Sequence, residues 1–179
     1  MNYQEIIQFW FHDIEPKQIW IKDAKFDQLI TDKFSKVYQQ ATRCELYDWR
    51  QSAEGCLAEI IVLDQFSRNM FRDSSLAFKY DALALCLAQS AVFQGIDKKI
   101  DKDKRGFIYL PYMHSESKII HQQALKIYQD HGVEGSLEFE IKHKNIIDRF
   151  GRYPHRNKVL GRKSTNEEIE FLKGPNSSF

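Results

Sequence analysis

Apolar residues recur every three or four positions along most of the chain, which is the period of an α-helix with one buried face. The clearest case runs from Lys22 to Arg43. Its apolar positions are Phe26, Leu29, Ile30, Phe34, Val37, Tyr38 and Ala41. Runs of alternating β-branched residues, which would indicate strands, are absent from the sequence. The pattern therefore predicts an all-α protein with no sheet.

Seven segments carry this helical pattern: Tyr3–His12, Lys22–Arg43, Ala53–Ser67, Ser75–Gln94, Ser115–Asp130, Gly135–Phe150 and Asn166–Leu172. The stretch Ile96–Gly106 is predicted to be a loop, and Phe107–Met113 a short apolar piece that Pro111 interrupts. Ser75–Gln94 is apolar over most of its circumference, so we expect it to be the central helix. Short links favour antiparallel neighbours, and 179 residues suit one domain, so we expect residues 1–179 to form stacked helical hairpins.

Three local signals mark helix ends. Ser52 precedes an apolar run as an N-cap, and Gly95 follows one as a left-handed C-cap. The residues Ser164-Thr165-x-Glu167-Glu168 form a capping-box pattern before the last helix.

Charge and composition narrow the classes of partner. The formal net charge is +1, which gives no bulk electrostatic case for binding nucleic acid or an anionic membrane. Three cysteines without paired spacing argue against a disulfide framework or a zinc site, and favour a reducing compartment. The N-terminal residues lack the pattern of a signal peptide, and no apolar run reaches membrane-spanning length. We expect a cytoplasmic protein with no membrane partner.

Two polar motifs at predicted helix ends share one spacing, in which an aspartate is followed by an aromatic residue and two arginines. Asp64, Phe66, Arg68 and Arg72 correspond in this way to Asp148, Phe150, Arg152 and Arg156. One interpretation is that each aspartate holds an arginine in a two-point ion pair, so that the guanidinium groups line an anion-binding pocket. The alternative is that the arginines cap the ends of the helices.

A third motif, from Phe107 to Glu116, contains Tyr109 and ends at His114 and Glu116. His114 with Glu116 could form an acid/base pair, which makes them the candidate catalytic residues. The alternative is that His114 or Ser115 caps the next helix and Glu116 complements its dipole. The histidine and carboxylate spacings fit no common metal motif, so neither a metal nor a cofactor is expected. The candidate ligand-binding residues are Asp64, Arg68, Asn69, Arg72, Tyr109, Arg149, Arg152, His155, Arg156 and Asn157.

These motifs resemble a known bacterial family, domain-of-unknown-function family 924. The likeness rests on FWF at Phe9–Phe11, LDQFSRNMFR from Leu63, FIYLPYMHSE from Phe107, and the long stretch from Asp148 to Glu168. It spans nearly the whole chain. The resemblance implies an all-α domain of tetratricopeptide-like helical hairpins and no settled activity.

The sequence leaves three hypotheses open. The motifs could converge on a pocket that binds a small phosphate- or carboxylate-bearing ligand. The arginines could instead clamp an acidic peptide in a groove between hairpins, as tetratricopeptide-like scaffolds do. In the third hypothesis every arginine is already paired within the protein and the motifs are structural.

Overall fold

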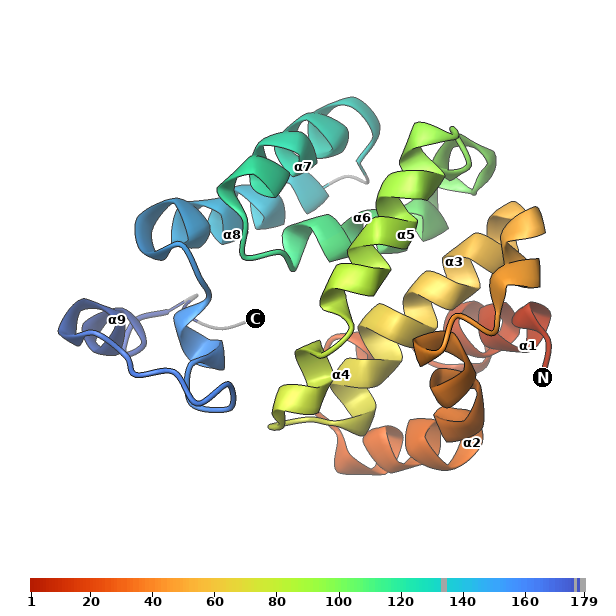
Figure 1. Ribbon diagram of the computed structural model, residues 1–179, viewed down its shortest axis with the longest axis horizontal. Helices are drawn as coiled ribbons and strands as arrows, with labels where there is room; N and C mark the ends of the chain where they lie inside the picture. Colours follow the sequence, from red (N-terminus) through yellow and green to blue (C-terminus); the bar gives the residue numbers. More distant parts are fainter. Residues whose placement is uncertain (133–134, 176, 178–179) are drawn as a thin grey trace.

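The computed structural model describes residues 1–132, 135–175 and 177, and within this part of the chain the secondary structure is helical, with no strand (Figure 1). The predicted all-α fold is therefore confirmed. The main helices are α1 (Tyr3–Gln8), α2 (Ala24–Thr42), α3 (Ala53–Ile61), α4 (Ser67–Met70), α5 (Asp81–Phe93), α6 (Lys102–Met113), α7 (Lys118–His131), α8 (Ser136–Phe150) and α9 (Asn166–Phe171). From α5 to α8 each helix packs on the next, as expected for successive hairpins.

The central helix is α3, together with the turns that continue it. A π-helical turn, Val62–Phe66, joins α3 to α4, so the helix runs on from Ala53 to Met70. Every residue from Gly55 to Ser67 in this helix is buried. Ser52 caps its start by accepting a hydrogen bond from the Gly55 amide, as predicted.

The prediction that Ser75–Gln94 is the central helix is wrong. Within α5 only Ala84, Ala88 and Ala91 are buried, and Phe93 is 92% exposed. Small alanines face the neighbouring helices, while the leucines of α5, including Leu83, are only partly buried. The sequence pattern misled because α3 carries buried polar residues that are neutralised by partners, whereas α5 carries apolar residues that stay near solvent.

Aromatic rings in stacked and edge-to-face pairs fill the space between α1, α2 and α3. The Phe34 ring lies 4.7 Å from the rings of both Phe9 and Phe66, and Trp10 lies 5.4 Å from Phe66, centre to centre. Large rings such as these provide much of the apolar area that a helical core buries.

The chain between Ile96 and Met113 is more ordered than predicted. Lys102–Met113 forms one continuous helix, α6, where the sequence predicted a loop followed by a short apolar piece. Its charged first turn resembles a solvated loop, which hid the start of the helix. Pro111 lies in the last turn, so its missing amide and its ring disturb the helix only where it is about to end.

A smaller C-terminal cluster lies apart from the aromatic core. It consists of Ile146, Ile147 and Tyr153, with Phe150 and Phe171 packed against them. Figure 1 shows α7, α8 and α9 on the opposite side of the molecule from α1, α2 and α3. Two predicted caps are also present: Thr165 and Glu168 form a capping box at α9, and Gly95 adopts the left-handed conformation after α5. Gly151 does the same after α8.

Within the described residues, one helical stretch, Ser75–Phe93, has the length and apolar composition of a membrane-spanning segment. A single segment of this kind is weak evidence for insertion in a membrane.

Candidate functional site

Asp64 is the centre of a buried polar cluster. It lies in the π-helical turn of the central helix, and its side chain is almost completely buried. Its carboxylate accepts hydrogen bonds from His114 Nδ1 at 2.7 Å and from Gln65 Nε2 at 2.5 Å, and Arg68 Nη1 lies 3.2 Å away. Burial alone would raise the pKa of Asp64, but the charge of Arg68, followed by the interaction with His114 and the hydrogen bond from Gln65, outweighs it and holds that pKa well below its ordinary value. Asp64 is therefore an ionised acceptor at neutral pH.

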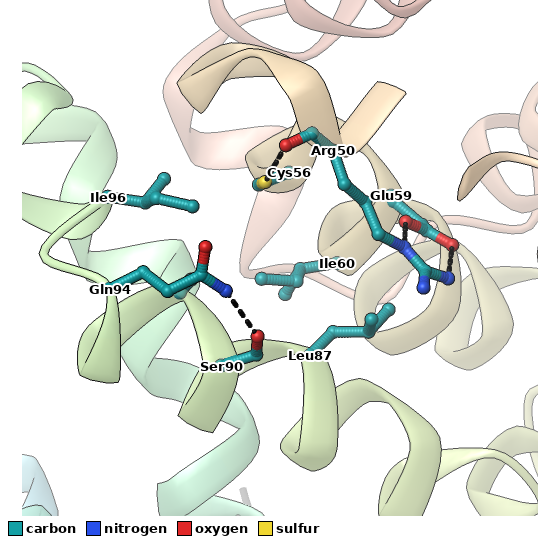
Figure 2. A pocket seen from close by; sticks show the side chains of 9 residues that line it. Arg50, Cys56, Glu59, Ile60, Leu87, Ser90, Gln94 and Ile96 are labelled. Atoms are coloured by element: carbon teal, nitrogen blue, oxygen red, sulfur yellow. Dashed lines mark hydrogen bonds and ion pairs between the residues drawn. The ribbon is translucent and has the colours of Figure 1, made fainter. Parts of the chain in front are cut away.

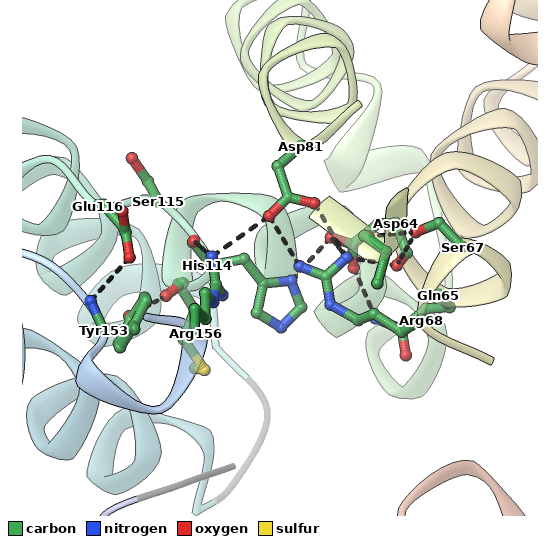
Figure 3. Close-up of polar contacts among 12 residues, drawn as sticks. Asp64, Gln65, Ser67, Arg68, Asp81, His114, Ser115, Glu116, Tyr153 and Arg156 are labelled. Carbon is green, nitrogen blue, oxygen red and sulfur yellow. Dashed lines mark hydrogen bonds and ion pairs between the residues drawn. The ribbon is translucent and has the colours of Figure 1, made fainter. Parts of the chain in front are cut away.

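His114 ends α6 and points its ring toward Asp64 (Figure 3). Burial lowers the pKa of His114, the Arg68 charge lowers it further, and Asp64 acts in the opposite direction. The ring is therefore neutral at pH 7. Because ionised Asp64 can only accept, the proton of the neutral ring belongs on Nδ1. Nε2 is left with a lone pair and has no hydrogen-bond partner among the described residues, and the side chain is 16% exposed.

Asp81, the first residue of α5, lies between two guanidinium groups. Arg68 donates to its two carboxylate oxygens at 3.1 and 3.0 Å, and Arg156 Nη1 approaches one of them at 3.4 Å. Arg68 also donates to the carbonyl of Asp64 at 2.6 Å, which is the helix-capping role considered from the sequence. The Asp81 carboxylate therefore contacts two arginines, and Arg68 makes the two shorter contacts.

Arg156 is the least satisfied cation of the cluster. It is 6% exposed, and its guanidinium carbon lies 4.5 Å from the ring centres of both Phe78 and Tyr153. Nη1 also donates to the carbonyl of His114 at 3.1 Å. Nε is buried without a hydrogen-bond partner, and no bond to Nη2 occurs in the part of the chain that the structure describes. Burial, followed by repulsion from Arg68, lowers the pKa of Arg156, so its charge is not fully compensated.

Four of the sequence-predicted residues thus meet: Asp64, Arg68, His114 and Arg156 (Figure 3). Gln65, Phe78, Asp81 and Tyr153 also contribute, although the sequence motifs did not single them out. Asp81 could have been noticed because it starts an apolar helix. The 3-10 turn Ser75–Phe78 that presents Phe78 had been assigned to that same helix.

The remaining candidates of the first motif, and Tyr109 of the third, lie elsewhere. Arg72 makes a two-point ion pair with Asp27 at 2.5 and 2.7 Å, and Asn69 donates to the same carboxylate. The Tyr109 hydroxyl donates to buried Asp97 at 2.7 Å. These contacts hold α2, α4 and α6 in place and leave no side chain directed at the Asp64 cluster.

The second motif, which begins at Asp148, mainly attaches α9. Contrary to the interpretation in which each aspartate holds an arginine, Asp148 binds Lys144, while Arg152 binds Glu168 of α9 at 2.6 and 2.8 Å. Arg149 pairs with Glu167. Asn157 donates to Ser164 and Glu168, and the half-buried ring of His155 leaves Nδ1 buried and unpaired.

Glu116 does not contact His114, so the expected acid/base pair is not formed. Its carboxylate accepts two hydrogen bonds from Arg162, at 2.5 and 2.9 Å, and one from the amide of Tyr153 at 2.8 Å. The capping alternative is also not observed, because α7 starts after Ser117 and His114 ends α6 instead. Asp64 takes the place that Glu116 was expected to have.

A cavity lies between α3 and α5, apart from the Asp64 cluster. Figure 2 shows this cavity of about 100 Å³, where Arg50 and Glu59 form a two-point ion pair at 2.7 Å for each contact. Burial raises the pKa of the nearby Cys56 thiol, which disfavours the reactive thiolate. The charged groups of this cavity, Arg50 and Glu59, already pair with each other, so the cavity is the weaker candidate site. Among the described residues, no group of three or more histidine, cysteine or acidic side chains is arranged to hold a metal ion.

Comparisons with known proteins identify relatives but no activity. Residues 6–176 match the family described as "Bacterial protein of unknown function (DUF924)". A solved structure, described as a protein of unknown function, ATU0120, from Agrobacterium tumefaciens, is 38% identical and superposes with a TM-score of 0.91. The match covers 96% of this chain and 97% of that one. No curated protein matches the sequence.

Proposed function

The chain belongs to the bacterial DUF924 family, whose function is unknown, and from its geometry we propose that it binds a small carboxylate- or phosphate-bearing molecule at Arg156, beside His114. The observation that supports this most directly is the unused donor edge of a buried guanidinium. Leaving a buried donor unpaired costs about 1–3 kcal/mol, and more for a charged group. Such a cost is expected where a ligand completes the hydrogen bonds.

The two aromatic rings determine how a ligand would meet Arg156. The Phe78 and Tyr153 rings each lie 4.5 Å from the guanidinium carbon, and the edge that carries Nε and Nη2 has the donors left for a ligand. That edge matches the two oxygens of a carboxylate or phosphate. Stacking also limits rotation of the side chain, so little further entropy is lost when an anion binds.

Without a ligand the charges of the cluster sum to zero, so one bound anion leaves a net negative charge and a second anion is disfavoured. Asp64 and Asp81 carry two negative charges, Arg68 and Arg156 carry two positive charges, and His114 is neutral. Because Arg68 takes both oxygens of Asp81, an incoming anion would compete only for Arg156. Protonation of His114 would add a positive charge, so we expect anion affinity to increase as the pH falls toward the lowered pKa of His114.

The alternative proposal, a scaffold that clamps an acidic peptide, has less support. An open groove of about 640 Å³ does run along α5, α6 and α7, with Phe93, Tyr112 and Ile127 in its wall. Of the residues that line it, however, Lys126 alone is charged. The arginines expected to clamp the peptide lie at the Asp64 cluster or are paired with Asp27 of α2 or with acidic residues of α9.

Thermal unfolding with added anions tests the proposal. Inorganic phosphate, acetate and succinate, each tested over a concentration series, should include at least one that raises the melting temperature, because a ligand of the native state stabilises it by RT ln(1 + [L]/Kd). Arg156→Lys keeps the charge but loses the two-point edge, so it should remove most of the shift. Arg43→Lys, at an exposed arginine outside the cluster, is the matched control and should keep the shift.

An equal response of Arg156→Lys and the native protein would contradict the proposal, since any shift would then come from another surface. The absence of a shift with all three anions would contradict it as well.

A further inference from the structure

The pairing of Asp64 with His114 provides more than anion binding requires. Arg156 alone offers the free donors for an anion, yet a buried carboxylate fixes the His114 ring through Nδ1 at 2.7 Å and leaves Nε2 without a partner among the described residues. A carboxylate that orients a histidine, whose other nitrogen remains available, is the arrangement of a general base.

Asp64 is held firmly enough for this role. Gln65 and Arg68 bind the same carboxylate, and the π-helical turn places it in the interior of the central helix. Such turns are rare and occur frequently at functional sites. Turning the Asp64 side chain away from His114 would also break its contacts with Gln65 and Arg68.

We propose that His114 is a general base, positioned by Asp64, that activates water to hydrolyse a carboxylic ester bond in the small anionic molecule bound at Arg156. This inference rests on the proposed function of the same site. His114 Nε2 is the catalytic group, and Asp64 is a positioning residue.

Water is the nucleophile that the surrounding residues favour. The Ser67 hydroxyl hydrogen-bonds to the carbonyls of Asp64 and Ala77, so it is not directed at the site. Figure 3 shows Ser115 pointing away from the His114 ring. No other hydroxyl contacts His114 in the described part of the chain.

The reaction balances with water alone. Nε2 takes a proton from water as the water oxygen bonds to the ester carbonyl carbon, and Asp64 stabilises the imidazolium that forms. As the carbon–oxygen bond of the ester breaks, Nε2 returns the proton to the departing alkoxide. The products are a carboxylic acid and an alcohol, and His114 is neutral again. Burial keeps the pKa of His114 low, so the neutral form needed for the first step predominates at pH 7.

A neutral reacting group fits the charges better than a phosphate ester does. Arg156 has the only unused donor edge of the cluster among the described residues, and it is committed to the recognised anion. A second anion reacting at Nε2 would lie near the carboxylates of Asp64 and Asp81 without a free cation to offset it. An uncharged ester carbonyl avoids this repulsion.

The test uses two probe esters that differ in one charge. 4-Acetoxybenzoate carries a carboxylate that cannot reach its own ester, and its methyl ester lacks that charge. We expect the native protein to hydrolyse 4-acetoxybenzoate with a kcat/KM at least tenfold higher than that of the methyl ester. His114→Gln should reduce hydrolysis about 100-fold or more, the usual contribution of a general base. His12→Gln, at an exposed histidine far from the cluster along the chain, is the matched control and should be unaffected.

The pH profile separates positioning from a purely structural role of Asp64. In the native protein the rate should rise with pH through the lowered pKa of His114 and then level off. Asp64 opposes the lowering of that pKa, so in Asp64→Asn the inflection should move to lower pH while the plateau rate falls. Should both variants fail to fold, the profile of the native protein still decides, because a rate that does not rise with pH below neutrality overturns the inference.

Binding and catalysis can fail separately. If anions raise the melting temperature through Arg156 but ester hydrolysis does not exceed that of His114→Gln, the general-base inference is overturned and the binding site stands. If neither effect is seen, both are overturned.

Discussion

The two sides of the molecule are held together by different interactions. Around α3, rings and aliphatic side chains such as Phe34, Phe66 and Leu57 exclude water almost completely. Around α7 and α8 the apolar cluster is small, and buried polar groups fill the space: His121 binds Glu140 at 2.8 Å, and both side chains are fully buried. Stability on the first side depends on how well apolar side chains fill the core, and on the second side it depends on hydrogen-bond partners for buried polar groups.

The candidate site lies where these two sides meet. Asp64 and Arg68 come from the central helix, Arg156 comes from the polar side, and His114 ends the helix that packs between them. A well-packed base fixes Asp64, while the polar side provides a guanidinium that folding leaves partly unsatisfied. The comparison teaches that a ligand is best sought where buried hydrogen-bond donors lack partners beside a rigid core.

Removing a ring from the aromatic side should have the largest effect. Phe66→Ala should lower the unfolding free energy by about 3–5 kcal/mol, because the cavity cannot collapse among packed rings. Phe93→Ala, at a 92% exposed phenylalanine, is the matched control and should change it by no more than about 0.5 kcal/mol. Leu83→Ala should fall between the two. Urea unfolding measures all three, and similar losses for Phe66→Ala and Phe93→Ala would show that the core is misplaced.

On the polar side, the His121–Glu140 pair should show that partners matter more than volume. Glu140→Leu should cost roughly 3 kcal/mol, because it leaves a buried imidazole without its partner. The double variant His121→Leu with Glu140→Leu should recover part of that loss. A double variant that loses the sum of the two single effects would show that the residues are not coupled.

Acid should destabilise the polar side before it affects the aromatic side. Burial lowers the pKa of His143 to about 3 and that of His155 to about 4, whereas the unfolded chain has values near 6.5. Below pH 6.5 the unfolded state therefore binds more protons, and the unfolding free energy should fall with decreasing pH by up to about 1.4 kcal/mol per pH unit for each histidine. Glu140, whose burial raises its pKa, acts in the opposite direction.

The measurement is urea unfolding between pH 7 and pH 5, where most carboxylates stay ionised. His155→Asn should flatten the pH dependence, while His12→Asn, at an exposed site, should leave it unchanged. Stability that is constant or increases toward pH 5 would rule out the assigned protonation states.

The smallest effect is expected where polar contacts are exposed. Lys173, which follows α9, pairs with Glu170 inside that helix, but both side chains lie mostly in solvent. Lys173→Ala should change the unfolding free energy by less than about 0.5 kcal/mol, because exposed pairs are screened and costly to order. A larger loss would mean that even surface ion pairs hold the polar side together.

Periodicity predicted most of the fold, because helices with one apolar face follow directly from the spacing of their residues. It failed for α5 and α6, where local composition and tertiary environment disagree. The alanines of α5 allow close packing while its larger residues remain near solvent, and the charged start of α6 resembles a loop. The particular likeness to tetratricopeptide domains stays a prediction.

The candidate site was predicted only in part. The motifs identified the arginines, but a pattern cannot show which carboxylate each will meet. Arg72 and Arg152 found partners far along the chain, Asp27 and Glu168, and those ion pairs now connect helices. Pairing of this kind depends on tertiary contacts, so the shared spacing could not show that Asp148 would bind Lys144.

The wide turn at Val62–Phe66 has a consequence for how this chain can change. A π-helical turn holds one residue more than an α-helical turn, so deleting a single residue there would restore a regular helix. The residues that follow, Arg68 and Asp81 among them, would rotate by about 100° relative to α3, which would change where they lie against the residues before the turn. The length of the chain at this one turn is therefore as much a determinant of the site as the identity of its side chains.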